Sequence, residues 1–501
     1  YWNSIFHKST ILKLETDLNF NIRNNFLAII LGVCFLLSMF SPVFAQEDQT
    51  HPEYVIQSGD TLIGIASLFG VTVDEIIELN NIEDSNQIYP GLILKIPGYS
   101  GVSGIIAPVT VELGESWNDL LVKYSANEEI IKKINHILLA SDLYAGTKLL
   151  VPVSQDQKLK LPLTVVGKES TLLEISALTS SNPFSLLLVN QKDSPFSFYL
   201  NDFVFSAISV ESEDMTVTTF QDVVSIGPLP LVQGSTAVIK INSKQPGTYA
   251  GKLNGLPLNF YSEDGIHYYA LQGIHAMAEP GLIELEVSRL ENGKETIIIQ
   301  QQLILEAGFF ETDPPLKVDP ALIDPVITKP ELDTIHSLVS VFSPEKYWQG
   351  NFLSPDHDYA TEIPNYEEVK EITSLFGNRR TYNDDPTITF HTGIDFGGGQ
   401  TLPVVAAADG KVVFAGFMEV RGNATIIDHG LGVFTAYFHQ SEISVKVGDM
   451  VSKGQRIGKV GNTGRVDRAD EYDGAGSHLH WELWVNGVQV NPLDWVNQEY
   501  P

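Results

Sequence analysis

The chain has 501 residues, with 31 Lys and Arg against 62 Asp and Glu and a formal net charge of −31. This length allows about three or four domains, and a hydrophobic fraction of 43% is enough for packed cores. The acidic balance argues against a nucleic-acid-binding protein, which needs clustered Lys and Arg, and against attraction to an anionic membrane. The single cysteine, Cys34, excludes a disulfide scaffold and a cysteine-rich zinc site.

The N-terminal segment has the pattern of a secretory signal. Lys8, Lys13 and Arg23 precede an apolar run at residues 26–40, and small residues follow before Ala45. We expect residues 1–45 to be a signal peptide, so that the mature protein is secreted or lies in the cell envelope, in the cell wall or periplasm. The alternative is an uncleaved membrane anchor, but the run is shorter than the roughly 20 residues that a spanning helix needs. We therefore expect no membrane span in the mature chain.

Residues 54–97 and 109–152 repeat each other at a constant offset of 55. In each copy the pattern predicts a short strand, two short helices and a closing strand. In the first copy an apolar stripe predicts the first helix, and Thr72 with Glu75 forms a capping box that opens the second. The matching positions are Gly59 and Gly114, Asn80 and Asn135, Tyr89 and Tyr144, Gly91 and Gly146, and Pro97 and Pro152.

A β-α-α-β unit of this size, with Gly-Asp-Thr-Leu at 59–62 after the first strand, resembles a LysM module. The module at 54–98 is a close match, and the one at 108–154 is degenerate. The resemblance implies binding of glycans that contain N-acetylglucosamine, such as peptidoglycan or chitin. It places the glycan groove around Gly59, Asp60, Thr61, Asn80 and Ile88. The alternative, which applies more to the second copy, is a small structural spacer.

The middle of the chain predicts strands. From 159 to 306, short apolar runs alternate with turn signals such as Asn254-Gly255, and no helical stretch is evident. We expect an immunoglobulin-like β-sandwich that serves as a spacer or adaptor, with His267 and His275 as ordinary packing or surface residues. Residues 311–340 contain five prolines, spread between residues 314 and 330, and this composition predicts a semi-rigid linker. The sequence leaves open whether this linker folds over a functional cleft.

Five of the twelve histidines lie between residues 391 and 480. In His391-Thr-Gly-Ile-Asp395 the nearby glycines argue against a helix and favour a bend that brings imidazole and carboxylate to one ion. His478-Leu-His480 leads into an apolar run with strand character, and residues two apart on a strand share a face. His439 ends another apolar strand.

Two imidazoles on one face of a strand are costly to bury unless something binds their lone pairs. Together these segments offer two histidines and one aspartate as ligands, with two histidines to spare. Zinc prefers tetrahedral sites of nitrogen and oxygen ligands, and a catalytic zinc keeps its fourth position for water. The pattern therefore indicates one zinc ion in a hydrolytic site rather than a two-metal centre.

Residues 372–494 resemble the lysostaphin/LytM-type zinc endopeptidases, which cleave peptide stems or cross-bridges of peptidoglycan. The matching motifs are Ser374-Leu-Phe-Gly-Asn-Arg-Arg380, His391-Thr-Gly-Ile-Asp395, Pro403-Val-Val-Ala-Ala-Ala-Asp-Gly410, Ile427-Asp-His-Gly430, Tyr437-Phe-His439, Val447-Gly-Asp449, Lys453-Gly-Gln455, Gly461-Asn-Thr-Gly464 and His478-Leu-His480.

By this resemblance the zinc ligands are His391, Asp395 and His480. His439 and His478 take the catalytic positions: one accepts the proton of water and the other hydrogen-bonds the oxyanion, in an order that the sequence leaves open. His429 is structural. The connection at 465–475 is longer and more acidic than is usual in the family, which puts the preferred cleavage site in doubt. Arg379 and Arg380 either line the cleft or, as we favour, pair with Asp384 or Asp385.

We therefore expect a multidomain, mainly β protein. Two LysM modules and a β-sandwich precede a peptidase domain at 341–501, built of antiparallel sheets like a duplicated hybrid motif. Its expected function is that of a secreted zinc endopeptidase that cuts the peptide part of peptidoglycan while LysM holds the glycan. The alternatives are an inactive regulator or scaffold of other wall hydrolases, and a chiefly glycan-binding wall protein. Because all five site positions are filled, the sequence favours the enzyme.

Overall fold

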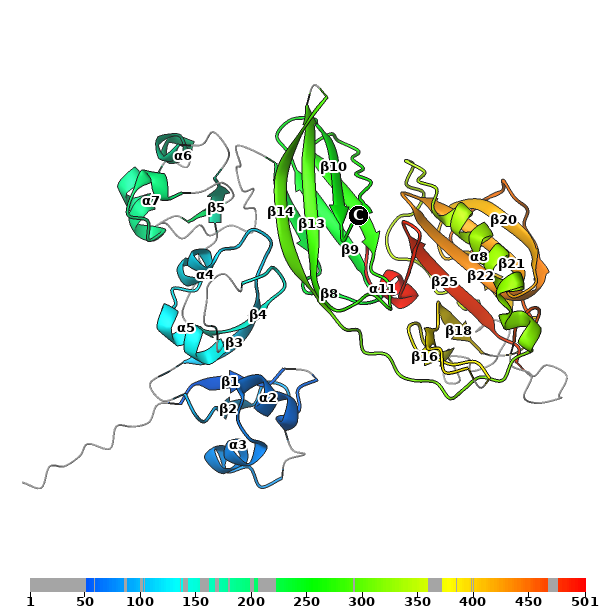
Figure 1. Ribbon diagram of the computed structural model, residues 1–501, viewed down its shortest axis with the longest axis horizontal. Helices are drawn as coiled ribbons and strands as arrows, with labels where there is room; N and C mark the ends of the chain where they lie inside the picture. Colours follow the sequence, from blue (N-terminus) through cyan, green and yellow to red (C-terminus); the bar gives the residue numbers. More distant parts are fainter. Residues whose placement is uncertain are drawn as a thin grey trace, which may run out of the picture.

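The structure is a computed structural model. It describes residues 51–153, 162–205, 222–358 and 372–501, apart from residues 58, 85–87, 100–101, 103, 136, 138–142, 167–170, 179–180, 199–201, 292, 384, 398, 400 and 467–475. The expected signal peptide and most of the acidic 465–475 connection therefore lie outside the described residues. Within the described part, no helix has the length and apolar character needed to cross a membrane. The chain is mainly β, with antiparallel sheets and few helices, as the sequence predicts (Figure 1).

The two LysM repeats share one sheet. The first contains β1 (Glu53–Val55), α2 (Leu62–Phe69), α3 (Val73–Asn80) and β2 (Ile93–Lys95), and the second contains β3 (Ile105–Thr110), α4 (Trp117–Lys123), α5 (Glu128–Asn135) and β4 (Lys148–Val153). β1 pairs antiparallel with β2 and parallel with β3, which gives the order β2-β1-β3-β4. Thr61 caps α2, and its predicted apolar stripe is buried. The predicted β-α-α-β pattern is confirmed in both repeats.

A third β-α-α-β unit follows. It contains β5 (Pro162–Val165), α6 (Leu172–Leu178), α7 (Pro183–Val189), a 3-10 turn η2 (Pro195–Ser197) and β6 (Phe203–Phe205), with β5 antiparallel to β6. The expectation of strands without helices from residue 159 is therefore wrong for this stretch. Local capping explains the helices, because Thr171 and Glu174 bond to each other's backbone N–H and Asn182 accepts from the first turn of α7.

Residues 223–306 form a two-sheet sandwich. One sheet has the order β11-β10-β13-β14-β8 and the other β12-β9-β7. Between them Ile239, Leu285 and Leu303 are fully buried. The bounds are β7 (Val223–Gly227), β8 (Leu231–Val232), β9 (Thr236–Asn242), β10 (Thr248–Leu253), β11 (Leu256–Pro257), β12 (His267–Gly273), β13 (Gly281–Glu291) and β14 (Lys294–Glu306). The predicted Asn254-Gly255 turn joins β10 to β11, with both residues at positive φ.

The C-terminal domain is built on a ten-stranded sheet with the main order β15-β18-β25-β22-β21-β20-β23. Strand β25, between β18 and β22, is buried at every residue. The bounds are β15 (Ile372–Ser374), β16 (Arg379–Arg380), β17 (Thr389–Phe390), β18 (Ile394–Phe396), β19 (Pro403–Val405), β20 (Gly410–Met418), β21 (Gly422–Gly430), β22 (Val433–Ile443), β23 (Met450–Val451), β24 (Arg456–Val460), β25 (Leu479–Val485), β26 (Val488–Val490) and α11 (Pro492–Asn497).

The proline-rich segment is folded onto this domain. After the 3-10 turn η3 (Pro320–Ile323), helix α8 (Pro325–Val339) runs through Pro330 and buries Ile335 and Val339 against the sheet. Figure 1 shows α8 lying across β20, β21 and β22. The expectation of an extended linker is therefore wrong for residues 325–339. Burial of one apolar face stabilises the helix despite the hydrogen bond that Pro330 cannot make.

Candidate active site

Strand pairing brings Asp395 and His480 together. β18 runs antiparallel to β25 with Asp395 directly opposite His480. His391 lies just before β18, and the bend between them passes close to β25. A Cβ on Gly393 would overlap the carbonyl oxygen of Trp481, so only glycine permits this approach.

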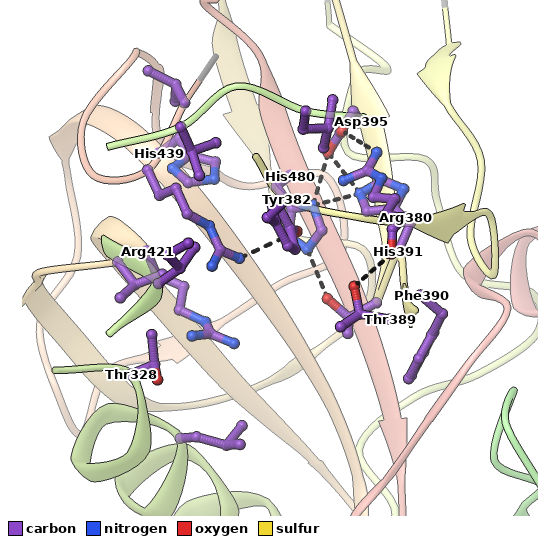
Figure 2. Close-up of a pocket in the computed structure, with 18 of the residues that line it drawn as sticks. Thr328, Arg380, Tyr382, Thr389, Phe390, His391, Asp395, Arg421, His439 and His480 are labelled. Carbon is purple, nitrogen blue, oxygen red and sulfur yellow. Dashed lines mark hydrogen bonds and ion pairs between the residues drawn. The ribbon is translucent and has the colours of Figure 1, made fainter. Parts of the chain in front are cut away.

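The side chains of His391, Asp395 and His480 converge on one point (Figure 2). Nε2 of His391 lies 3.0 Å from Nδ1 of His480 and 3.1 Å from Oδ1 of Asp395, and Nδ1 of His480 lies 2.7 Å from the same oxygen. Ligand atoms of a tetrahedral zinc ion, with bonds of about 2.0–2.1 Å, lie about 3.3 Å apart. The three atoms therefore have the separations of a compact metal site.

Each ring has a hydrogen-bond acceptor on its outer side. Nδ1 of His391 lies 2.9 Å from the carbonyl oxygen of Leu375, and Nε2 of His480 lies 3.2 Å from Oε1 of Glu482. In the neutral tautomers whose outer nitrogens donate to these oxygens, the two inward nitrogens carry lone pairs. Two lone pairs and a carboxylate oxygen then face one another without a proton, an arrangement that a cation would stabilise. Two imidazoles and one carboxylate are a donor set that fits zinc.

Burial and neighbouring groups shift the titration of these residues. Burial lowers the pKa of His391. Burial alone would raise the pKa of Asp395, but the imidazole of His391 holds it well below its usual range. Likewise Glu482 has a pKa of about 2 despite its burial, because it hydrogen-bonds His480, and the two carboxylates raise the pKa of His480 against the effect of burial. The site therefore holds two ionised carboxylates at neutral pH.

His439 and His478 lie beside this cluster. Their ring centroids are 4.8 Å apart, and Nε2 of His478 is 3.8 Å from Oδ1 of Asp395. Nδ1 of each ring donates to a backbone carbonyl 2.7 Å away, that of Thr463 for His439 and that of Gly476 for His478. Each ring therefore presents a free Nε2 lone pair, the atom that can take up a proton.

The backbone of His439 is in the left-handed region, with φ 60. Its N–H donates to the carbonyl oxygen of Arg421 at 2.9 Å, which holds it in this conformation. Burial and the neighbouring His478 lower the pKa of His439 well below its usual value. Figure 2 shows His439 and Arg421 on one side of the pocket, with His391 and Arg380 on the other.

Glu482, which is not among the predicted site residues, also belongs to the site. It accepts from His480 and, at 2.5 Å, from Thr392, and it takes the indole N–H of Trp484 at 2.8 Å. It thereby fixes the orientation of His480. The signal was present in the sequence, because His480 and Glu482 alternate along β25 and so share a face.

Arg380 also belongs to the site. Its Nε donates to Asp313 at 2.8 Å, and its guanidinium lies 3.4 Å from Asp395. Arg379 donates instead to the carbonyl oxygens of Gly377 and Ala276. The favoured pairing of these arginines with Asp385 is therefore wrong. Asp384 lies outside the described residues. Asp313 is 82 residues from Asp395, and only the docked proline-rich segment brings it here.

The docked segment forms one wall of a pocket of about 490 Å³ above the histidines. Leu316, Val318, Ile323 and Leu332 line it. The segment is held by backbone hydrogen bonds: Leu316 donates to Thr381 and accepts from Asn383. The histidines thus lie at the base of a cleft that is apolar along the docked segment.

His429 stands apart from this chemistry. Its ring is buried, with Nδ1 2.8 Å from the carbonyl oxygen of Asp409 and Nε2 2.7 Å from the hydroxyl of Thr435. Burial lowers its pKa to about 4. Both nitrogens are used within the fold, which agrees with the structural role that we expected.

Most of the expected glycan residues support the backbone of the first module. Asp60 accepts from Tyr54 and Gln57, and Thr61 caps α2. The side chain of Asn80 donates to and accepts from Lys95. Ile88 packs against the module core, whereas Gly59 is exposed at φ 92.

Two family models match parts of the chain. Residues 389–492 match peptidase family M23, and residues 54–97 and 109–152 match the LysM domain. The chain therefore carries one M23 peptidase domain and two LysM domains.

Curated relatives align with less than a third of this chain. A peptidoglycan DD-endopeptidase, ShyA of Vibrio cholerae, is 42% identical over 24% of this chain and 26% of its own length. A DD-carboxypeptidase/endopeptidase, Mpg of Neisseria meningitidis, is 44% identical over 21% of this chain and 23% of its own. This chain thus spans about a quarter of these relatives. The crystal structure of a putative peptidase M23 from Pseudomonas aeruginosa aligns at 23% identity and a TM-score of 0.37, over 54% of this chain and 96% of that one.

Proposed function

We propose that this chain, which carries an M23 peptidase domain and two LysM domains, is a zinc-dependent endopeptidase of the cell envelope that hydrolyses peptide bonds in peptidoglycan. The observation that carries the proposal is the meeting of two imidazole lone pairs and one carboxylate oxygen, with two more histidines beside them. Three protein ligands leave a fourth position free, as in hydrolytic zinc sites.

In this proposal His391, Asp395 and His480 hold one zinc ion. When bound, zinc polarises a carbonyl and lowers the pKa of water towards neutrality. His439 and His478 lie side by side, and the Nδ1 of each is bonded to a backbone carbonyl, which leaves its Nε2 to hold or take up a proton. The neutral ring accepts a proton from the attacking water, while the protonated ring donates a hydrogen bond to the developing oxyanion. The accepted proton then passes to the leaving amine.

The LysM region supplies attachment. The net charge of −31 does not attract anionic wall polymers, so recognition of neutral sugars by LysM would hold the enzyme to its substrate. The relatives whose names include peptidoglycan endopeptidase activity support this substrate class. We propose that the mature chain acts in the cell wall or periplasm after removal of residues 1–45.

The test is digestion of purified peptidoglycan by the full chain. We expect released fragments whose masses correspond to hydrolysed peptide bonds with intact glycan linkages. Chelation should stop their release, and added zinc should restore it. Binding to peptidoglycan without any new peptide ends would reject the enzyme in favour of an inactive scaffold or a glycan-binding protein.

A further inference from the structure

The third β-α-α-β unit repeats the first two in its hydrogen bonds. The side-chain amides of Asn80, Asn135 and Asn190 each donate to the carbonyl of the residue four positions earlier and to that of the residue fifteen positions later. The side-chain oxygen of each asparagine accepts from the backbone N–H of the same later residue. All nine distances lie between 2.7 and 2.9 Å. The three asparagines are spaced 55 residues apart, so the same locking contact recurs with the same period.

The period of 55 extends through the whole unit. The residues that cap the first helix are Thr61, Ser116 and Thr171, and those at the start of the second are Thr72, Asn127 and Asn182. The LysM model matches the first two units, at residues 54–97 and 109–152. Residues 162–205 thus have the fold of a third LysM-like repeat.

Strand β14 of the sandwich covers the second repeat at the place where the first presents its expected glycan groove. The N–H of Gly114 donates to the side chain of Gln301 at 2.8 Å, and Ile304 donates to the carbonyl oxygen of Ala145 at 2.8 Å. Leu113 and Ala145 are buried in the sandwich core. Both loops that would border a groove are therefore attached to one strand.

The third repeat covers the second from another side. Asn118 of α4 donates to the carbonyl oxygen of Asn190 at 3.0 Å. In α4, Asp119, Val122 and Lys123 are buried, whereas the matching residues of α2 are exposed. In Figure 1 the second repeat, with β3, β4 and α4, lies between the first repeat and the third.

The first repeat is open at the same positions. A Cβ added to Gly59 or Gly91 would meet no atom within 4 Å, whereas one on the matching Gly146 would lie 3.2 Å from Ile304 and Pro230. Tyr89, in the loop after α3, is 61% exposed. A ligand can therefore reach this loop in the first repeat.

We infer that the first repeat alone of these two LysM domains binds glycan, and that the second is a structural joint whose groove is filled by β14 and buttressed by the third repeat. The inference rests on the proposed function, since it takes the ligand to be a glycan that contains N-acetylglucosamine. It divides two domains of the same family, in one chain, into a binding module and a packing module.

The test uses Tyr89→Ala and its matched control Tyr144→Ala, each in the full chain with His391→Ala so that the wall is not degraded. In sedimentation with purified peptidoglycan, we expect Tyr89→Ala to weaken binding about tenfold, on the scale of one lost aromatic contact. Tyr144→Ala should bind like its parent. Equal weakening by a folded Tyr144→Ala would overturn the inference, whereas a parent chain that does not bind at all contradicts the proposed function.

Hydrogen–deuterium exchange gives a test without substitutions in the modules. With an N-acetylglucosamine oligosaccharide added to the full chain, we expect slower exchange at residues 59–64 and 88–92. The matching residues 114–119 and 143–147 should exchange at an unchanged rate. Protection of the second repeat would show an accessible groove and refute its assignment as a joint.

Three guanidinium groups line the pocket beside the histidines of the candidate site, although the chain as a whole is strongly acidic. Arg380 pairs with Asp313, and Arg421 pairs with Glu331 at 3.1 Å. Arg465 stacks on the ring of Tyr382 at 4.8 Å and makes long contacts of 3.4 and 3.5 Å to the carbonyl of Leu322 and the hydroxyl of Tyr382.

No carboxylate among the described residues contacts Arg465. Its N–H donates to the carbonyl oxygen of Val420 at 2.7 Å, and the next residue, Arg421, accepts from His439. Arg465 is therefore joined through two consecutive residues to a histidine of the candidate site. Burial lowers the pKa of Arg465, as do the nearby guanidinium groups of Arg421 and Arg380, whereas Tyr382 and Glu331 act in the opposite direction.

We propose that Arg465 binds a carboxylate of the substrate peptide beside the scissile bond. A planar guanidinium stacked on an aromatic ring is well suited to a carboxylate, and the apolar wall of the docked segment strengthens the pairing by excluding water. This subsite rests on the proposed endopeptidase and specifies an acidic peptide as its substrate.

The test compares one defined peptide substrate as its free carboxylate and as its carboxamide. We expect Arg465→Gln to lower kcat/KM about 10- to 100-fold for the carboxylate form and little for the carboxamide, as for the loss of a charged hydrogen bond. Arg456→Gln, the same change at an exposed site outside the pocket, should affect neither. Equal losses on both peptides would overturn the subsite, whereas no cleavage of either by the parent chain contradicts the proposed function itself.

Discussion

Replacing His391 by alanine is expected to remove bound zinc and to reduce peptidoglycan hydrolysis by at least about 10³-fold, because metal assistance is worth several kcal/mol of barrier lowering. The inward Nε2 of His391 lies about equally far from the other two ligand atoms, at 3.0 and 3.1 Å, so its loss leaves only two donors. Zinc content is measured by elemental analysis of the purified chain, and activity by the release of soluble fragments.

His267→Ala is the matched control. His267 belongs to the sandwich, where it pairs with Asp264 and is half exposed, so its loss should leave zinc content and hydrolysis unchanged. Binding of His391→Ala to intact peptidoglycan should also persist, since the LysM region is untouched. A His391→Ala chain that still hydrolyses the wall at the parent rate would refute the ligand assignment.

The second large effect is expected on substitution of His439 or His478, and it should be a loss of catalytic rate without a loss of zinc. Substitution at either position should lower kcat by about 10²–10⁴-fold, the usual contribution of a general acid or base, while zinc remains bound. At His439 the replacement of choice is asparagine, which tolerates the left-handed backbone that this position requires. At His478, glutamine keeps a polar side chain near Gly476.

The readout that separates this pair from the ligands is the combination of zinc content and rate. One zinc per chain with a strongly reduced kcat supports roles in proton transfer or oxyanion binding. Loss of zinc from His439→Asn would instead place this residue among the ligands, and an unchanged kcat would remove it from the chemistry. The pH dependence of kcat/KM should then lose one limb in the variant that lacks the general base.

The residues of the candidate site were visible in the sequence because their spacing has chemical meaning. His478 and His480 alternate on an apolar strand, and His391 and Asp395 bracket a glycine that permits a bend. Local spacing alone does not set distances between segments. Asp395 faces His480 because of the register of β18 on β25, a pairing between residues 85 positions apart.

The proline-rich segment was misjudged because the contacts that decide its structure are long-range. Prolines at 320, 325 and 330 favoured an extended linker, but the buried face of α8 against the sheet outweighs their local effect. In the third repeat the signal was local and was overlooked: Thr171, Asn182 and Asn190 continue the period of 55. Its apolar pattern is weaker than that of the first two copies, so the helix-capping residues are what identify it as a repeat.

By itself, the sequence determined the residue types of the site, the repeating modules and the mainly β character of the chain, since all three depend on local spacing and on the alternation of apolar residues. Only the tertiary structure decided which lone pairs face one another, which segment walls the pocket and which LysM domain remains open. Those properties depend on strand register and on packing between distant segments, and neither is encoded in any short stretch of the chain.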